Sequence, residues 1–229
     1  MNRAISLLLL CVLVAASVAR AASAPALDEL VAKNIQARGG ISALHAMHSL
    51  TLRGKLLIND GQFELGFVQT VARPSSIRIE ASIQGMTQVQ AYNGAFGWQI
   101  NPFQGRKDPE RMSADDIKSL AETVADFDGA LVDSQSKHNK LEYLGTEDVD
   151  GTQAHKIKLT RQNGDTEYVY LDPDHFLEIR LLSQRIEHGV TVETETDLGD
   201  YEKVQGVFCL LYTSPSPRDG ATSRMPSSA

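Results

Sequence analysis

Cysteine is scarce in this chain. Of 229 residues only Cys11 and Cys209 are cysteine, and each lies in an end segment that differs in composition from the rest. The 187 residues between these segments, 22–208, contain none. Disulfide cross-links, thiol catalysis and cysteine-ligated metals are therefore excluded for the middle of the chain.

Positive charge is also scarce. The chain has 22 Lys and Arg against 29 Asp and Glu, a formal net charge of −7. Residues 22–208 alone hold 18 basic and 28 acidic side chains, which gives a net charge of −10. Proteins that bind the phosphate backbone of nucleic acids need clustered positive charge, so we exclude a nucleic-acid partner.

Long apolar runs are missing, except for a short one at the N-terminus. Ile5–Val14 is apolar, follows Arg3, and precedes Ala19 and Ala21 in the A-x-A spacing of a cleavage site. This pattern is typical of a secretory signal peptide, so we predict one over residues 1–21. The run is shorter than the ~20 residues that a membrane-spanning helix needs. We therefore expect the mature protein to be exported.

The C-terminal segment, residues 209–229, has neither helical nor strand periodicity. It holds three of the eight prolines and is rich in serine, a composition that predicts disorder. It also resembles a tail that recurs on unrelated open reading frames from fragment-assembled sequence data, where an adapter has been translated in frame. A genuine flexible tail is the alternative. Either way we expect the folded domain to span residues 22–208, and an adapter would mean that it is truncated after about Phe208.

Two stretches have helical periodicity. Ala26–Arg38 is an amphipathic pattern that stops at a Gly-Gly pair, and a short helical turn over Ile41–Met47 follows it. Much later, Ser113 can cap a helix together with Asp116 three residues on. The apolar stripes of the two amphipathic helices are Leu27, Leu30, Val31 and Ile35, and Ile117, Leu120, Val124 and Phe127.

Most of the remaining sequence alternates with a period of two, which predicts strands. Asn59–Gly61, Asn93–Gly94 and Asn163–Gly164 are typical hairpin turns, whereas 101–111 has no regular pattern. Ten or so strands in meander order predict a mainly β fold, a curved antiparallel sheet that forms an incomplete barrel covered by helices. The predicted strands are 50–58, 63–71, 77–83, 86–92, 95–100, 141–145, 153–161, 166–172, 176–186, 190–196 and 202–208.

Signatures of catalysis and metal binding are not found. The chain lacks G-x-S-x-G, H-E-x-x-H, P-loop and G-x-G-x-x-G motifs. His45 and His48 have a spacing that can pair on a helix, but no third ligand is close in sequence. Asp172, Asp174 and His175 are typical first of all of a turn. We predict no enzyme, metal or cofactor, and keep an enzyme with an unusual site as the least favoured alternative.

What remains is a concave apolar surface. A curved sheet with Leu, Ile, Phe and Val on one face, covered by amphipathic helices, is the architecture of a protein that binds hydrophobic ligands. The alternative is that the same side chains pack a filled core. The sequence leaves both open.

Two segments carry a family resemblance. Val71–Pro74 reads V-A-R-P, and Tyr92–Phe103 reads Y-N-G-A-F-G-W-Q-I-N-P-F. They resemble the LolA-like family of periplasmic carriers that sort outer-membrane lipoproteins, in which an R-P pair precedes a strand and a D/N-G-x-x-x-W-x-x-N-P-F stretch follows one hairpin later. The resemblance extends through Lys158–Leu181 and covers most of residues 22–208. It implies an unclosed antiparallel barrel with helical lids over an apolar cavity.

The resemblance also implies site residues. Arg73 matches the family arginine whose hydrogen bonds hold the lid helices and which is implicated in release; an ordinary strand-end arginine is the alternative. Trp98 would line the cavity or fill the core. The other candidate cavity residues follow from strand alternation, and a register error of one residue would reverse their direction. They are Leu52, Leu56, Phe63, Phe67, Ile79, Ile83, Val89 and Phe96.

The function implied is that of a monomeric periplasmic carrier or chaperone. It would hold the acyl chains of a lipoprotein, or a lipid, between a membrane-bound donor complex and an outer-membrane acceptor. Gly39–Gly40 and the turn after it resemble the broader sorting relatives more than the best-known carriers, which leaves the client open. An envelope sensor of mislocalised lipoproteins with the same fold is the main alternative.

Overall fold

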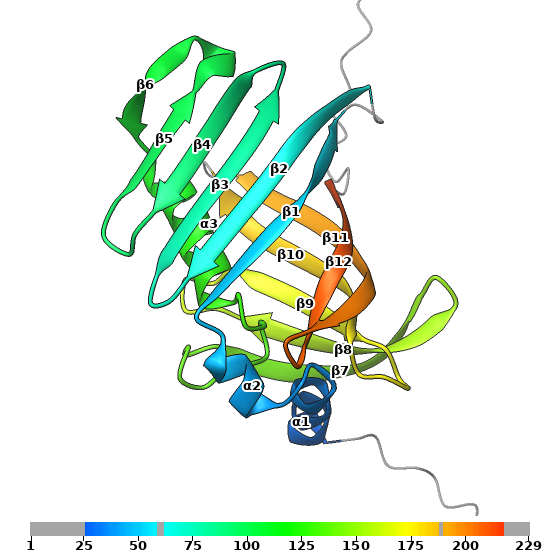
Figure 1. Cartoon of the computed structure of the whole chain (residues 1–229). Coiled ribbons are helices and arrows are strands. Elements are labelled where there is room, and N and C mark those ends of the chain that lie inside the picture. Colours follow the sequence, from blue (N-terminus) through cyan, green and yellow to red (C-terminus); the bar gives the residue numbers. More distant parts are fainter. Residues whose placement is uncertain (1–25, 59–61, 188–189, 218–229) are drawn as a thin grey trace, which may run out of the picture.

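The strands form two antiparallel sheets of six strands each. A computed structural model describes residues 26–58, 62–187 and 190–217, and in each sheet the strands pair in sequence order (Figure 1). The first sheet contains β1 (Ser49–Ile58), β2 (Phe63–Ala72), β3 (Ser76–Ile83), β4 (Met86–Tyr92), β5 (Gly97–Asn101) and β6 (Arg106–Arg111). The second contains β7 (Lys140–Val149), β8 (Thr152–Thr160), β9 (Thr166–Leu171), β10 (Glu178–Glu187), β11 (Val190–Val204) and β12 (Val207–Pro217).

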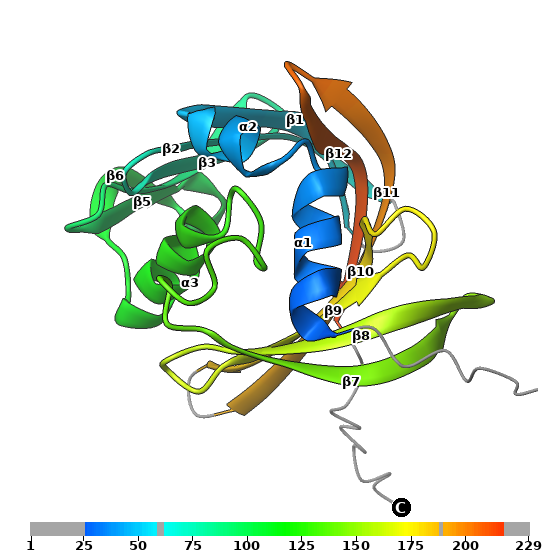
Figure 2. The same ribbon diagram turned by 90° about the horizontal axis from the view of Figure 1, so that it is seen from below.

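The helices lie between the sheets and at one end of them. They are α1 (Leu27–Ala37), α2 (Ile41–Ala46) and α3 (Ala114–Ala125), with a 3-10 turn η1 (Pro102–Gln104) in the first sheet. Figure 2 shows α1 and α3 inside, α1 toward the second sheet and α3 toward the first. Among the described residues the two sheets do not hydrogen-bond to each other. The prediction of a mainly β, incomplete barrel with covering helices is confirmed.

Each inner helix packs through the apolar stripe that its sequence predicts. In α1, Leu30 is fully buried in a cluster with Ile157, Val169 and Leu171 of the second sheet. In α3, Leu120 and Val124 pack against Val71, Ile77 and Met112. Ser113 caps α3 as predicted, because its Oγ accepts a hydrogen bond of 3.1 Å from the Asp116 amide.

The segment between α3 and β7 contributes to the core. Its sequence, residues 126–139, looks polar and predicts no element. Yet Leu131 packs with Leu30 and the second sheet, and Val132 packs with Leu44 of α2 and Val207 of β12. Both are almost fully buried. The segment therefore joins the three helices and the second sheet into one interior.

Several strand predictions differ from the structure. Residues 106–111 form β6, whose Pro109 is tolerated because β6 is an edge strand and needs no partner on one side. β11 continues to Val204, so the last hairpin turns at Gln205–Gly206 rather than before Glu202. β12 continues beyond Phe208 to Pro217 and pairs with β11, where the sequence predicted disorder from residue 209. The predicted signal peptide, the turn at 59–61 and residues 218–229 lie outside the described residues.

The end of α1 and the turn of the last hairpin touch through glycine. A Cβ atom on Gly39, whose φ is +122°, would lie 2.4 Å from the carbonyl oxygen of Gly206. The amide of Phe208 donates a hydrogen bond of 2.9 Å to the carbonyl of Arg38. Only glycine at position 39 allows this approach, so the N-terminal helix and the last hairpin are held together at this point.

We expect Gly39→Ala to lower the free energy of unfolding by about 1–3 kcal/mol more than Gly40→Ala does. Both glycines have positive φ, so both substitutions strain the backbone. Only at position 39 would the new methyl group also meet backbone, because the nearest atom at position 40 is 3.8 Å away in the flexible side chain of Gln36. Urea unfolding measures the difference, and equal midpoints for the two variants would contradict the contact.

Candidate functional site

The strand register decides which predicted cavity residues face the interior. Val71 and Ile77 pack on α3, and in β1–β4 the residues paired in register with them or two positions away share this inner face. The inner face is apolar over much of its length. Six of the nine predicted ligand-binding residues lie on it, namely Leu52, Leu56, Phe63, Phe67, Ile79 and Ile83. Of these, Phe63 at the start of β2 is 51 % exposed, so it lies on the inner face but not in the interior.

The other three predicted residues do not face inward. Val89 pairs with Glu80 on the outer face of β3, and Trp98 lies on the same face, 5.8 Å from the guanidinium of Arg78. Phe96 precedes β5 and is 49 % exposed. The turn at Gln84–Gly85 explains the difference. Across this two-residue turn each odd-numbered residue of β3 pairs with an even-numbered residue of β4, as Ile79 does with Gln90. The inner face therefore carries odd-numbered residues in β3 and even-numbered residues in β4.

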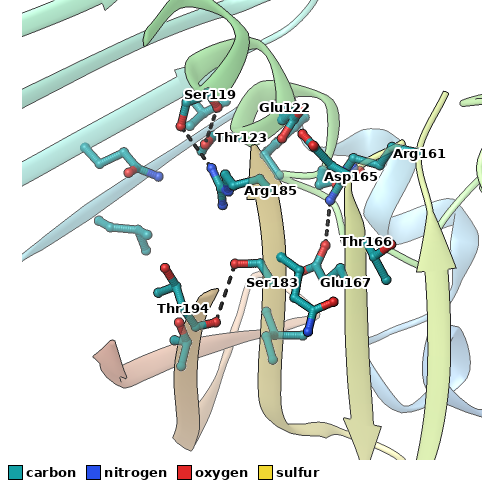
Figure 3. A pocket seen from close by; sticks show the side chains of 18 of the residues that line it. Ser119, Glu122, Thr123, Arg161, Asp165, Thr166, Glu167, Ser183, Arg185 and Thr194 are labelled. Atoms are coloured by element: carbon teal, nitrogen blue, oxygen red, sulfur yellow. Dashed lines mark hydrogen bonds and ion pairs between the residues drawn. The ribbon is translucent and has the colours of Figure 1, made fainter. Parts of the chain in front are cut away.

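A cavity of about 360 Å³ lies between the first sheet, α3 and β9–β11 of the second sheet (Figure 3). The side toward the first sheet is largely apolar and is formed by Leu50, Leu52 and Val71, with Phe127 after α3 and one polar side chain, Gln69. The opposite side is polar. Its residues include Ser119, Thr123, Glu167, Ser183, Arg185, Thr194 and Thr196. The apolar cavity expected from the sequence therefore describes only one of its walls.

A buried ionic cluster forms the polar side nearest the α3–β7 segment. Arg161 contacts Asp126 at 2.6 Å and Glu167 at 2.5 Å. Lys137 lies 3.3 Å from the same Asp126 and 3.0 Å from Asp128. Burial raises the pKa of the Glu167 carboxyl, and the neighbouring Arg161 pulls that pKa in the opposite direction. The charges of this wall are therefore largely engaged with one another.

A smaller cavity of about 150 Å³ adjoins the main one. Its lining shares Leu50, Leu52 and Phe127 with the main cavity. It adds Arg38, which follows α1, Met47, which follows α2, and residues of the last hairpin that begin at Val207. Of the nine predicted ligand-binding residues, only Leu52 lines either cavity. Sequence reasoning placed Phe127 on the stripe of α3 but did not identify it as a cavity residue.

Arg73 connects the first sheet to both covering elements. Its Nε donates a hydrogen bond of 3.0 Å to the carbonyl of Met47, at the end of α2. Its Nη2 donates one of 2.7 Å to the carboxylate of Asp128, which is only 3 % exposed. The guanidinium also lies 4.8 Å from the ring of Phe127. A single side chain at the end of β2 thus contacts α2 and the α3–β7 segment.

Several of the residues considered as metal ligands have other partners. His45 Nε2 lies 2.7 Å from a carboxylate oxygen of Asp133. Asp172 Oδ1 accepts hydrogen bonds from the backbone amides of Asp174 and His175, which is turn geometry. Within the described ranges, no group of three or more His, Cys, Asp or Glu is placed to hold a metal ion. The helices of the described chain are too short or too polar to cross a membrane.

Comparison with known proteins identifies the fold. No protein-family model and no curated protein matches the chain. Among solved structures, a LolA superfamily protein from Nitrosomonas europaea matches with a TM-score of 0.55 at 10 % identity, over 86 % of this chain and 88 % of that one. A putative outer membrane lipoprotein-sorting protein domain from Vibrio parahaemolyticus matches with a TM-score of 0.49 at 10 % identity, over 74 % and 77 % of the two chains. The chain has a LolA-like fold.

Proposed function

We propose that the protein is a non-catalytic carrier that binds the acyl chain of a lipoprotein or lipid between its two sheets. The observation that carries the proposal is the main cavity, one wall of which is formed by Leu50, Leu52, Val71 and Phe127. Its volume falls within the usual range of small-molecule sites, about 300–1,000 Å³. The LolA-like fold supports it, because the structure from Nitrosomonas europaea is named as a LolA superfamily protein, and the sequence resemblance to the LolA-like family implies a carrier.

The physical need for such a carrier is large. Exposure of apolar chain to water costs about 0.8 kcal/mol per CH2, so a chain of ~16 carbons costs on the order of 12 kcal/mol. A cavity between two sheets shields that surface without covalent chemistry. The predicted signal peptide over residues 1–21 supports a periplasmic location, in which a lipid-modified client crosses an aqueous space between two membranes.

We expect the protein purified natively from an envelope extract to carry an acyl ligand. The protein's own side chains leave a cavity of about 360 Å³ between the sheets. We expect an acyl chain that is bound there to stay bound during purification. Mass spectrometry of organic-extractable material, compared with the same protein after delipidation, identifies it. Absence of any acyl compound from the native preparation would count against the carrier.

Leu52→Asp should weaken binding of a palmitoyl probe by at least about tenfold, because it places a charge in the apolar wall that both cavities share. Leu57→Asp is the matched control, since Leu57 lies on the same strand, points outward and is 66 % exposed. Fluorescence displacement measures both affinities. If both variants lost the same affinity, or neither lost any, the palmitoyl probe would have to bind at another place on the protein.

Arg73→Leu should leave loading intact and slow transfer to acceptor membranes. In the structure Arg73 holds α2 and the α3–β7 segment against the first sheet. We infer that re-forming these bonds helps to expel the client, so that their loss favours the loaded state. The matched control is Arg78→Leu, because Arg78 lies on the outer face of β3 and bonds Glu80. Transfer by the Arg73 variant at the control rate would refute this role.

A further inference from the structure

We propose that the main cavity recognises the polar head of its lipid and selects an uncharged head that carries hydroxyl, ester or amide groups, as in a monoacylglycerol. This inference rests on the proposed function and adds a ligand class to the same site. It follows from the contrast between the two walls of the cavity, from the polar groups left available there, and from the pairing of the charged groups around them.

The inner face of the second sheet changes polarity along its strands. Near α1 it is apolar, where Val169 and Leu181 contact the core around Leu30. Two residues further along β9 and β10, the same face carries Glu167 and Ser183, which pair with each other in register. The facing wall of the first sheet is largely apolar, with Leu50 and Leu52 on the cavity side. A ligand in this cavity therefore meets hydrocarbon on one side and polar groups on the other.

Several uncharged polar side chains line the cavity with their hydrogen-bonding groups available, and three of them belong to β2 and β11. Gln69 comes from β2, and Thr194 and Thr196 come from β11, on the face shared by Ser183 and Leu181. Within the part of the chain that the structure describes, none of these three side chains hydrogen-bonds to another protein group. An amide and two hydroxyls can both donate and accept, which suits glycerol hydroxyls, esters and amides.

The cations around the cavity are already paired, which opposes an anionic head. Four carboxylates line it, those of Glu122, Asp126, Asp165 and Glu167. Lys118 lies 2.6 Å from Asp165 and Lys137 lies 3.3 Å from Asp126. Arg161 is engaged by Asp126 and Glu167, and Arg185 donates a hydrogen bond of 3.1 Å to Ser119. A phosphate placed here would be desolvated beside these carboxylates and would have to compete with them for their cationic partners. The same acyl chain with a neutral head avoids this cost.

The test compares two probes with the same acyl chain, monopalmitoylglycerol and palmitoyl-lysophosphatidylglycerol, by displacement of a fluorescent fatty acid from the delipidated protein. We expect the neutral lipid to bind at least about tenfold more tightly. The double variant Thr194→Val, Thr196→Val should weaken monopalmitoylglycerol by about fivefold or more, because valine keeps the shape and removes both hydroxyls. The control is Thr51→Val, Thr70→Val, on the outer face of the first sheet, where the two hydroxyls lie 3.2 Å apart. It should bind like the wild type.

The outcomes separate this proposal from the proposed function. Equal or tighter binding of the anionic lipid, or an inner double variant that binds like the control, would overturn the selection of a neutral head while leaving an acyl carrier in place. Failure of both lipids to bind a protein whose circular dichroism shows an intact fold would overturn the carrier itself, and the head selection with it.

Discussion

The buried carboxylate of Asp128 is the interaction on which the arrangement of the covering elements depends. One of its oxygens accepts from Arg73 of β2 at 2.7 Å and the other accepts from Lys137 at 3.0 Å, while its backbone carbonyl accepts from Arg38 at 2.9 Å. A carboxylate that is 3 % exposed is tolerated only when it is paired in this way. The single residue therefore ties the first sheet, the end of α1 and the α3–β7 segment together, and the cavities lie beside this junction.

The cavity beside that junction is two-sided because the two sheets have different inner faces. The apolar wall of the first sheet is suited to an acyl chain, and the polar wall of the second would be a poor surface for one. A carrier with a wholly apolar pocket would bind any chain by burial alone. In the carrier proposed here, the two unlike walls would give the two orientations of a bound amphiphile different free energies, so the cavity would orient its ligand as well as shield it.

Local patterns in the sequence predicted most of the helices and strands, but they did not predict the long-range contacts between them. Both amphipathic helices, the Ser113 cap and the strands flanking the N-G and D-G turns follow from spacing and propensity. Val89 was assigned the wrong face because its direction depends on the pairing of β4 with β3, and Leu131 was missed because its burial depends on elements far away in sequence. Arg73 was identified through a resemblance, but its partner Asp128, 55 positions later, carries no sequence signal. The polar wall was not predicted either, because the sequence does not show which face Thr194 and Ser183 share until the pairing of β10 with β11 is known.

The contact between Gly39 and Gly206 also bears on how the chain folds. It joins the first helix to the turn of the last hairpin, and the cluster of Leu44, Val132 and Val207 closes around the same place. The interior of this protein cannot be completed until residues beyond 200 are available. These contacts join residues far apart in sequence, so the entropy cost of closing a loop over most of the chain comes before the contacts can stabilise the fold. A polypeptide with these contacts lacks a complete core during most of its synthesis. An incompletely folded chain is also easier to pass through a narrow channel than a folded one.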